Sequence, residues 1–449
     1  MKKLCLFLII SKLAFAQTIS FEEALNQTIE NSKDLQKQKI NIDIAKTNSD
    51  FIDGLNFGKV SLNSDISRTN HSGYVFMGKL SSREATFKDF GFAQNKGDMS
   101  IAPKDLNYPD SYTSINSYIS YDLPLFTGFA LYHQKGILKL QEKANEILYN
   151  LDKKTLEFEV LKAYNSAVLA KDFVKTMQKA KDTIGFIKNG AKEFHKNGLV
   201  TKIDVNEAEL YFLNTNSNLI EAENNFKLSL AYLKFLTSNE NISDVENLQN
   251  TYLEIKEFED LYKIALKNRD EITLQNISIE ANNKNIKANQ GSYYPSVFTH
   301  LEYGYNDDKF STSKDKDYYM ALLGISLTLF DGTRSANLEK SRLEYLKAKL
   351  DFEKLQDGIK LEVQKAILDY KAKQEILKEK ILASELASSV LNQAKLQYKN
   401  RLISMTTLLS QETNYRQSQT MLLNAKYENS LALARLNLVL GQNLQKDYK

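Results

Sequence analysis

Hydrophobic residues alternate with polar ones in four short segments of the chain, and elsewhere they recur at helical spacing. In the first segment Val60, Leu62 and Ile66 alternate with polar side chains such as Ser61 and Asp65. A period of two is typical of a strand with one apolar and one polar face. Each segment has about ten residues, the length of a strand that crosses a membrane. Strands are expected at about 58–68, 113–126, 296–306 and 318–329.

Long helices are predicted after the second and fourth strands. The 69 residues between Gly128 and Gly198 contain no proline, and hydrophobic residues recur there every seven positions. This is the pattern of a coiled coil, and a helix of that length measures about 100 Å. A second helix of similar length is expected from about Thr333 to Asn400. Shorter helices are expected at about 21–52 and 202–236.

The chain contains two copies of one unit, because these patterns occur twice in the same order. The stretch "YDLPLFTG" at 121–128 shares its pattern with "ISLTLFDG", which follows 204 residues later. The stretch "HKNGLVTKIDVNEAE" at 195–209 aligns with "YKNRLISMTTLLSQE" at an offset of 203, which pairs Glu209 with Glu412. Near the start of each copy the offset is 237, so the first copy holds about 33 additional residues.

The repeat predicts the organisation of the chain. An insertion is expected between the first two strands, and each copy reads as a helix, two strands, a long helix, a tight turn and a returning helix. The expected boundaries are a signal peptide at 1–16, a first repeat at 17–236 with its insertion at about 69–112, a linker at 237–256, a second repeat at 257–441 and a tail at 442–449.

The N-terminus reads as a secretory signal, with an apolar run followed by a small-residue cleavage site at Ala14–Ala16. The chain has 59 Lys+Arg and 56 Asp+Glu, and the expected signal contains three lysines and no acid, so the remaining charges balance. A balanced chain offers no basic surface for nucleic acid. The single cysteine, Cys5, lies in the expected signal, and the four histidines lack metal-ligand spacing. We expect no metal, no cofactor and no enzymatic activity.

The four strands are expected to enter a membrane as part of an oligomer. No segment beyond the expected signal has the roughly 18 consecutive apolar residues of a membrane-spanning helix. Open sheet edges are not tolerated in lipid, because their backbone groups have no water to bind. Four strands are too few to close a barrel, since single-chain barrels begin at about eight. Two copies would supply eight strands and three copies would supply twelve.

The order of these motifs resembles the TolC family of outer-membrane efflux proteins. The resemblance rests on "ALNQTIENSKDL", "IALKNRDEI", "GSYYPSV", the duplicated "LxLFxG" and "NGLVTKIDV". It implies a mixed α/β membrane protein, a homotrimer whose 12-stranded β-barrel lies in outer-membrane lipid and continues as a periplasmic α-helical barrel. It also implies a Gram-negative envelope, a periplasmic adaptor protein and an inner-membrane transporter as partners.

The resemblance assigns roles to three groups of residues. The two helical turns are expected to dock the adaptor through Asn197, Gly198, Leu199, Val200 and Thr201 in the first copy and Asn400, Leu402, Ile403 and Ser404 in the second. The candidate gate residues are Asp204, Tyr398 and Arg401. The junction between barrel and tunnel is expected at Leu123, Phe126, Gly128, Leu327, Phe330 and Gly332.

Local chemistry gives the turns a definite expected geometry. Gly198 suits the left-handed conformation that ends a helix, and Thr201 suits the cap of the next helix. Asn400 and Ser404 are expected to fill the same places in the second copy. Arg401 stands where the family usually has glycine, and a plain helical hairpin remains the alternative for each turn.

The leading functional interpretation is a passive exit duct for drugs or other small molecules in a tripartite efflux pump. Two alternatives remain open from the sequence. One is a duct for polypeptides in type I secretion, and the other is a periplasmic coiled-coil protein without a pore. Conductance in a planar bilayer distinguishes a duct from a coiled-coil protein.

Overall fold

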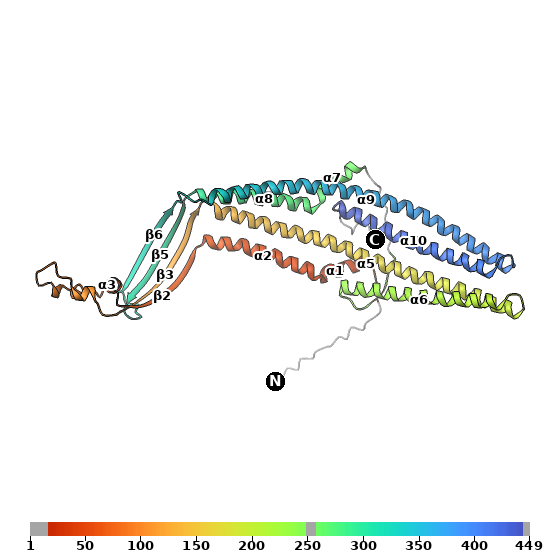
Figure 1. The fold of residues 1–449 in the computed structure, drawn as a ribbon, viewed down its shortest axis with the longest axis horizontal. Helices are drawn as coiled ribbons and strands as arrows, with labels where there is room; N and C mark the ends of the chain where they lie inside the picture. The colour runs from red at the N-terminus through yellow and green to blue at the C-terminus, as the bar shows by residue number, and fades with distance from the viewer. Residues whose placement is uncertain (1–16, 248–256, 443–449) are drawn as a thin grey trace, which may run out of the picture. The chain divides into compact units, whose positions relative to one another are not determined.

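The structure is a computed structural model that describes residues 17–247 and 257–442 (Figure 1). These residues form two compact units, each built from segments far apart in the sequence. The expected signal peptide lies outside the described residues, as do parts of the expected linker and tail. Among the described residues, the first unit contains 17–41, 145–247, 257–276 and 350–442, and the second contains 42–144 and 277–349.

Two long helices dominate the chain, each followed by a helix about half as long. Helix α5 (Ala130–Lys196) has 67 residues and α9 (Arg334–Lys399) has 66. Tight turns connect them to α6 (Lys202–Thr237) and α10 (Met405–Val439). Helical bounds close to these are expected from the sequence. Within the described ranges, none of the helices combines the length and the apolar character needed to cross a membrane.

The helices that begin each repeat are broken once, at equivalent positions. Helices α1 (Phe21–Asn31) and α2 (Lys33–Asn56) replace the single helix expected at about 21–52. In the second copy, helices α7 (Phe258–Asn268) and α8 (Asp270–Gln290) stand in place of the single first helix expected of each copy. Ser32 and Arg269 take ψ angles of 117° and 126°, which no helix accommodates, and they lie 237 residues apart. The break therefore belongs to the repeated unit.

One buried cluster of the first unit lies where the first repeat begins and ends. Strands β1 (Gln17–Ile19) and β4 (Ile242–Val245) pair in parallel. The buried Tyr164 of α5 donates its hydroxyl hydrogen bond to the carbonyl oxygen of Ile19, at 2.9 Å. The Asn31 amide donates to the carbonyl oxygen of Thr237, at 2.8 Å, so the end of α1 meets the end of α6.

The second unit contains one antiparallel sheet of four strands (Figure 1). The spatial order is β2-β3-β5-β6, and the outer strands β2 and β6 each have one neighbour within the described residues. The strands are β2 (Lys59–Thr69), β3 (Tyr112–Thr127), β5 (Ser296–Asp307) and β6 (Asp317–Ser326). The short 3-10 helix η2 (Gly291–Tyr293) precedes β5.

The fourth strand ends earlier than expected. The sequence places it at about 318–329, but β6 ends at Ser326, and residues 327–331 form no regular element. The pairing explains this end, because β5 begins at Ser296 and Ser296 is the partner of Ser326. Residues beyond Ser326 have no neighbouring strand to pair with on the β5 side.

The insertion of the first repeat is ordered and lies at the end of the sheet remote from Gly128. It contains α3 (Ser72–Ser81), η1 (Phe92–Gln94) and α4 (Lys104–Asn107). Arg83 donates to the carbonyl oxygens of Asp315 and Asp317, at 3.0 and 2.7 Å. Lys316 donates to the carbonyl oxygen of Ser82, at 2.6 Å. The insertion is thus tied to the turn between β5 and β6.

Candidate functional sites: the sheet and the helical tips

The register of the sheet separates an apolar face from a polar one. Leu62 lies opposite Ile119, which lies opposite Tyr303 and, in turn, Tyr319. The exposed apolar side chains on this face include Val60, Leu62, Ile66, Ile119, Leu323 and Ile325. Leu62 is 79% exposed in the single chain, which is unfavourable in water. This face therefore suits an apolar surrounding.

A connected polar network lies on the opposite face. His300 Nδ1 lies 2.6 Å from Asp122 Oδ1, and His300 Nε2 lies 3.2 Å from Glu302 Oε2. The Tyr318 hydroxyl is within hydrogen-bond distance of both Glu302 and Asn116. These side chains come from β3, β5 and β6, so the network crosses three strands. Such a face is stable in water and costly in lipid.

The duplicated motif adopts two different local structures. Leu123 and Phe126 lie within β3, and Gly128 follows with a φ of 61°, in the left-handed region. Leu327 and Phe330 lie outside β6, and Phe330 is 88% exposed. Gly332 does not have a left-handed φ, so the two glycines of the motif differ in backbone conformation.

The residues directly before these two glycines, Thr127 and Asp331, also differ in their contacts. The Thr127 hydroxyl accepts a long hydrogen bond from the backbone of Leu131, at 3.4 Å. Asp331 Oδ1 instead accepts from the backbone and the hydroxyl of Thr333, both at 2.8 Å. Asp331 therefore orders the turn that precedes α9, and the carbonyl oxygen of Thr333 accepts a backbone hydrogen bond from Asn337.

The first helical tip has the local geometry that its sequence predicts. Gly198 has a φ of 71°. The backbone N–H of Leu199 donates to the carbonyl oxygen of Phe194, at 2.8 Å, closing the last turn of α5. Thr201 caps α6 and forms a reciprocal capping box with Asp204. The remaining docking candidates take part in the same turn: Asn197 donates to the carbonyl oxygen of Glu193, and the Val200 carbonyl oxygen contacts His195 Nδ1.

The second tip has the same form, but the expectation that Asn400 takes the place of Gly198 is wrong. Arg401 has the left-handed φ, 61°, and Asn400 does not. The reason is the register of the repeat, which aligns Arg401 with Gly198. Leu402 donates its backbone hydrogen bond to Gln397, and Ser404 caps α10 by accepting from the backbone of Thr407, at 3.1 Å. Ile403 is half-buried between them.

Two of the three gate candidates lie close enough to influence each other. The Thr201 hydroxyl and backbone donate to the Asp204 carboxylate and hold its pKa below the ordinary range. Burial raises the pKa of Tyr398, and the negative charge of Asp204 raises it further. The Tyr398 hydroxyl is buried and has no hydrogen-bond partner among the described residues. Arg401 is exposed and forms no ion pair in the described part of the chain.

An apolar groove of about 840 Å³ adjoins the tips, between α5 and α9. Phe186 and Phe194 of α5 line it together with Leu396 and Tyr398 of α9. Phe186 is 80% exposed, a large apolar side chain open to solvent in the single chain. The sequence does not predict this groove, because the groove depends on how two helices lie side by side.

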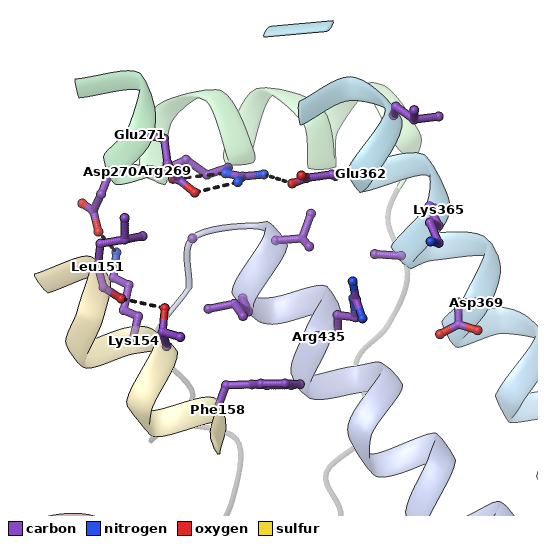
Figure 2. Close-up of a pocket in the computed structure, with 16 residues that line it drawn as sticks. Leu151, Lys154, Phe158, Arg269, Asp270, Glu271, Glu362, Lys365, Asp369 and Arg435 are labelled. Carbon is purple, nitrogen blue, oxygen red and sulfur yellow. Dashed lines mark hydrogen bonds and ion pairs between the residues drawn. The ribbon is translucent and has the colours of Figure 1, made fainter. Parts of the chain in front are cut away.

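A second cavity, of about 690 Å³, is lined by α5, α9, α10 and the break between α7 and α8. Figure 2 shows Arg269 between Glu271 and Glu362, with closest approaches of 2.6 and 2.5 Å. Lys154 of α5 donates to Asp270, at 2.7 Å (Figure 2). Burial lowers the pKa of Arg269, but the carboxylates of Glu271 and Glu362 outweigh this effect and raise it above the ordinary value. These ion pairs link α5 to α8, and the break before α8 to α9, which is typical of a structural contact.

The comparisons with known proteins agree with this fold. Residues 261–442 match the family described as outer membrane efflux protein. None of the curated proteins compared with the chain matches it. The resemblance to the TolC family that the sequence predicts is confirmed by the family match together with the likeness to solved structures.

Three solved outer-membrane proteins illustrate the likeness. The Campylobacter jejuni CmeC channel is 14% identical, with a TM-score of 0.74 over 94% of this chain and 85% of that chain. VceC of Vibrio cholerae is 15% identical, with a TM-score of 0.75 over 95% and 97%. The open state of the Neisseria gonorrhoeae MtrE channel is 15% identical, with a TM-score of 0.75 over 95% and 90%. At these identities the likeness is one of fold.

Proposed function

We propose that this chain, a relative of the TolC family of outer-membrane efflux proteins, forms the outer-membrane duct of a tripartite efflux system. Three copies would join their sheets into a 12-stranded barrel, and the long helices would continue it as a periplasmic tunnel. The duct would pass drugs or other small molecules without acting as an enzyme. A periplasmic adaptor and an inner-membrane transporter would supply its cargo.

The observation that carries this proposal is the two-faced, open-edged sheet. Its apolar face exposes side chains such as Leu62 and Leu323, and its opposite face holds the network of Asp122, His300 and Glu302. The free edges of β2 and β6 need partners in lipid, and four strands are too few to close alone. Association of several copies satisfies both requirements and turns the polar network toward a water-filled lumen.

The helical tips are proposed to dock the adaptor. The two turns, at 197–201 and 400–404, are mostly exposed and each presents an exposed leucine, Leu199 or Leu402. The apolar groove beside Phe186 offers buried area to a partner helix. Phe186→Ser and Phe186→Leu test this role. The serine variant should lose adaptor binding in a pull-down of the assembled protein, and the leucine variant should keep most of it.

Electrical recording tests the duct itself. The mature protein should insert into planar bilayers and conduct in discrete steps, and a coiled-coil protein without a pore would leave the bilayer silent. Alanine at Asp204, Tyr398 or Arg401 should raise the conductance if these residues hold the tip closed. Unchanged conductance in all three variants would reject the gate assignment while leaving the duct intact.

Co-purification identifies the cargo class. An inner-membrane drug transporter captured with the protein and its adaptor supports the small-molecule pump. Capture of a polypeptide exporter would contradict that part of the proposal and favour type I secretion. Neither outcome affects the conductance test, so the two parts of the proposal are judged separately.

A further inference from the structure

Equivalent glutamates of the two repeats have opposite surroundings. Glu209 in α6 pairs with two lysines of α5, at 3.5 Å from Lys188 Nζ and 3.0 Å from Lys192 Nζ. Its side chain is 38% exposed. The hydrogen bond from Lys192 holds the pKa of Glu209 below its ordinary value. In the first hairpin, an ionised glutamate therefore links the returning helix to the long helix.

The second copy lacks this cross-helix link. Glu412 is 2% exposed, and its Oε2 is buried without a hydrogen-bond partner among the described residues. The residue equivalent to Lys188 is Leu391, which is itself buried. The nearest cation is Arg416, one turn further along α10, with Nε 3.7 Å from Glu412 Oε2. The ion pair lies within one helix and does not bind α10 to α9.

A cavity adjoins the buried carboxyl. It has a volume of about 430 Å³ and is lined by α5, α9 and α10, with Glu412 and Arg416 in its wall. The other charged groups that face it are Lys179 and Asp182 of α5 and Lys395 of α9. The space exceeds what several water molecules need, and its lining is mostly polar.

The neutral and the ionised forms of Glu412 need different numbers of hydrogen bonds from their surroundings. Burial disfavours the carboxylate and raises the pKa of Glu412, although Arg416 and then Lys395 act in the opposite direction. A neutral carboxyl tolerates the burial of Oε2, which has no partner among the described side chains. An ionised one needs hydrogen bonds that those side chains do not supply, so water from the cavity must reach Oε2, and α10 must move away from its neighbours to admit it.

We propose that Glu412 is a proton-binding site that locks the second helical hairpin when it is occupied and loosens it when the proton leaves. The first hairpin responds in the reverse sense, because Glu209 links its helices only when ionised. Acidification thus tightens α10 against α5 and α9 while it weakens the contact of α6 with α5. The proposal concerns the helices themselves and holds whether or not the protein conducts.

The sign follows from the direction of each shift. A carboxyl with a raised folded pKa stabilises the fold fully below its unfolded pKa, and this contribution is lost as the pH rises through the folded value. A carboxyl with a lowered folded pKa contributes above its unfolded pKa, and this contribution is lost as the pH falls. Glu412 is the first case and Glu209 is the second.

Hydrogen exchange of the full-length protein tests the proposal, with Glu412→Gln and Glu209→Gln as a matched pair. After correction for intrinsic exchange, peptides from 405–420 of the native protein should be less protected at pH 8 than at pH 5. The change should approach tenfold for each unit by which the folded pKa is raised, since one unit is about 1.4 kcal/mol.

Glu412→Gln should remove this pH dependence and protect α10 at pH 8 at least as well as the native residue does. Glu209→Gln should instead lower the protection of 202–217 at both pH values, because the pKa of Glu209 lies below the ordinary value of 4.5 and the native residue is ionised at pH 5 and at pH 8.

Two results would overturn the proposal. If Glu412→Gln weakens α10 at pH 8 as Glu209→Gln weakens α6, Glu412 acts as an ionised link like its counterpart. If the native protein shows no pH dependence in 405–420, or the variant keeps it, Glu412 does not control the hairpin.

Discussion

The backbones of Gly128 and Gly291 lie directly against each other where β3 leaves the sheet. A Cβ atom at Gly128 would come within 2.2 Å of the Gly291 carbonyl oxygen, and a Cβ atom at Gly291 within 2.7 Å of the Gly128 carbonyl oxygen. Gly128 also has a φ of 61°, which side-chain-bearing residues rarely adopt. Two independent constraints therefore require glycine at the start of the first long helix.

Gly128→Ala should destabilise the protein, because it adds backbone strain to a contact that has no room for a methyl group. We expect a loss of about 2–4 kcal/mol, measured as a lower unfolding temperature in detergent. Gly332→Ala is the matched control, since its nearest non-neighbouring atom lies 4.0 Å away and its φ is not left-handed. Equal destabilisation by the two substitutions would show that the Gly128 contact is not the cause.

The first tip shows what local chemistry can predict. Gly198 and Thr201 have few conformational alternatives at a helix end, and the structure gives them the expected left-handed turn and cap. The prediction that Asn400 adopts the left-handed conformation is wrong, because Arg401 adopts it instead. A preference for asparagine in the left-handed region is weaker than the register of the repeat, which places Arg401 opposite Gly198. The alignment of the two copies therefore predicts the left-handed position of the second turn better than residue preference does.

Other features depend on tertiary packing and leave little trace in the sequence. The motif around Leu327 resembles the one around Leu123, but β3 extends to Thr127 while β6 ends at Ser326, where β5 begins. Similarly, aligning Glu209 with Glu412 identifies a pair without showing that only the second is buried. Burial depends on which helices surround a residue, and the local sequence does not contain that information.

Thr201→Ala should loosen the first turn of α6. The Thr201 hydroxyl accepts from the backbone of Asp204, at 3.3 Å, and donates to the Asp204 carboxylate, at 2.7 Å. Loss of such a cap costs about 1 kcal/mol. Hydrogen exchange of 202–206 should show faster opening by about fivefold, with unchanged exchange in the middle of α6.

The same cap should weaken on acidification. Because the pKa of Asp204 is lowered in the folded chain, its contribution is present above the ordinary aspartate pKa and is lost as the pH falls through the lowered value. The first turn of α6 should therefore lose protection in acid, and Asp204→Asn should remove that pH dependence. The cap of α10 is the internal control, because Thr407 replaces the aspartate there. An equal acid-dependent loss in the first turn of α10 would count against this explanation.

Arg401→Gly should stabilise the second tip. Arg401 has a left-handed φ of 61°, and glycine adopts this conformation without a Cβ penalty. We expect a gain of up to about 1 kcal/mol, read from the unfolding temperature or from exchange in the last turn of α9. Asn400→Gly is the matched control and should give no gain, because Asn400 has no left-handed φ to relieve. A gain from Asn400→Gly and none from Arg401→Gly would reverse the assignment.

Arginine substitutions on neighbouring residues of β2 test whether the sheet faces two solvents. Leu62 lies on the apolar face and is 79% exposed, and Ser61 lies on the opposite face across from Ser120. An arginine facing the middle of a bilayer costs about 2–4 kcal/mol, whereas one facing water costs little. Leu62→Arg should therefore lower the equilibrium constant for folding into lipid vesicles, measured by titration with denaturant, by about 30-fold or more, and Ser61→Arg should leave it nearly unchanged. Strand propensity and position along β2 are almost the same for both sites, so a difference reports the face alone. Equal effects of the two substitutions would mean that the two faces of this sheet do not meet different solvents.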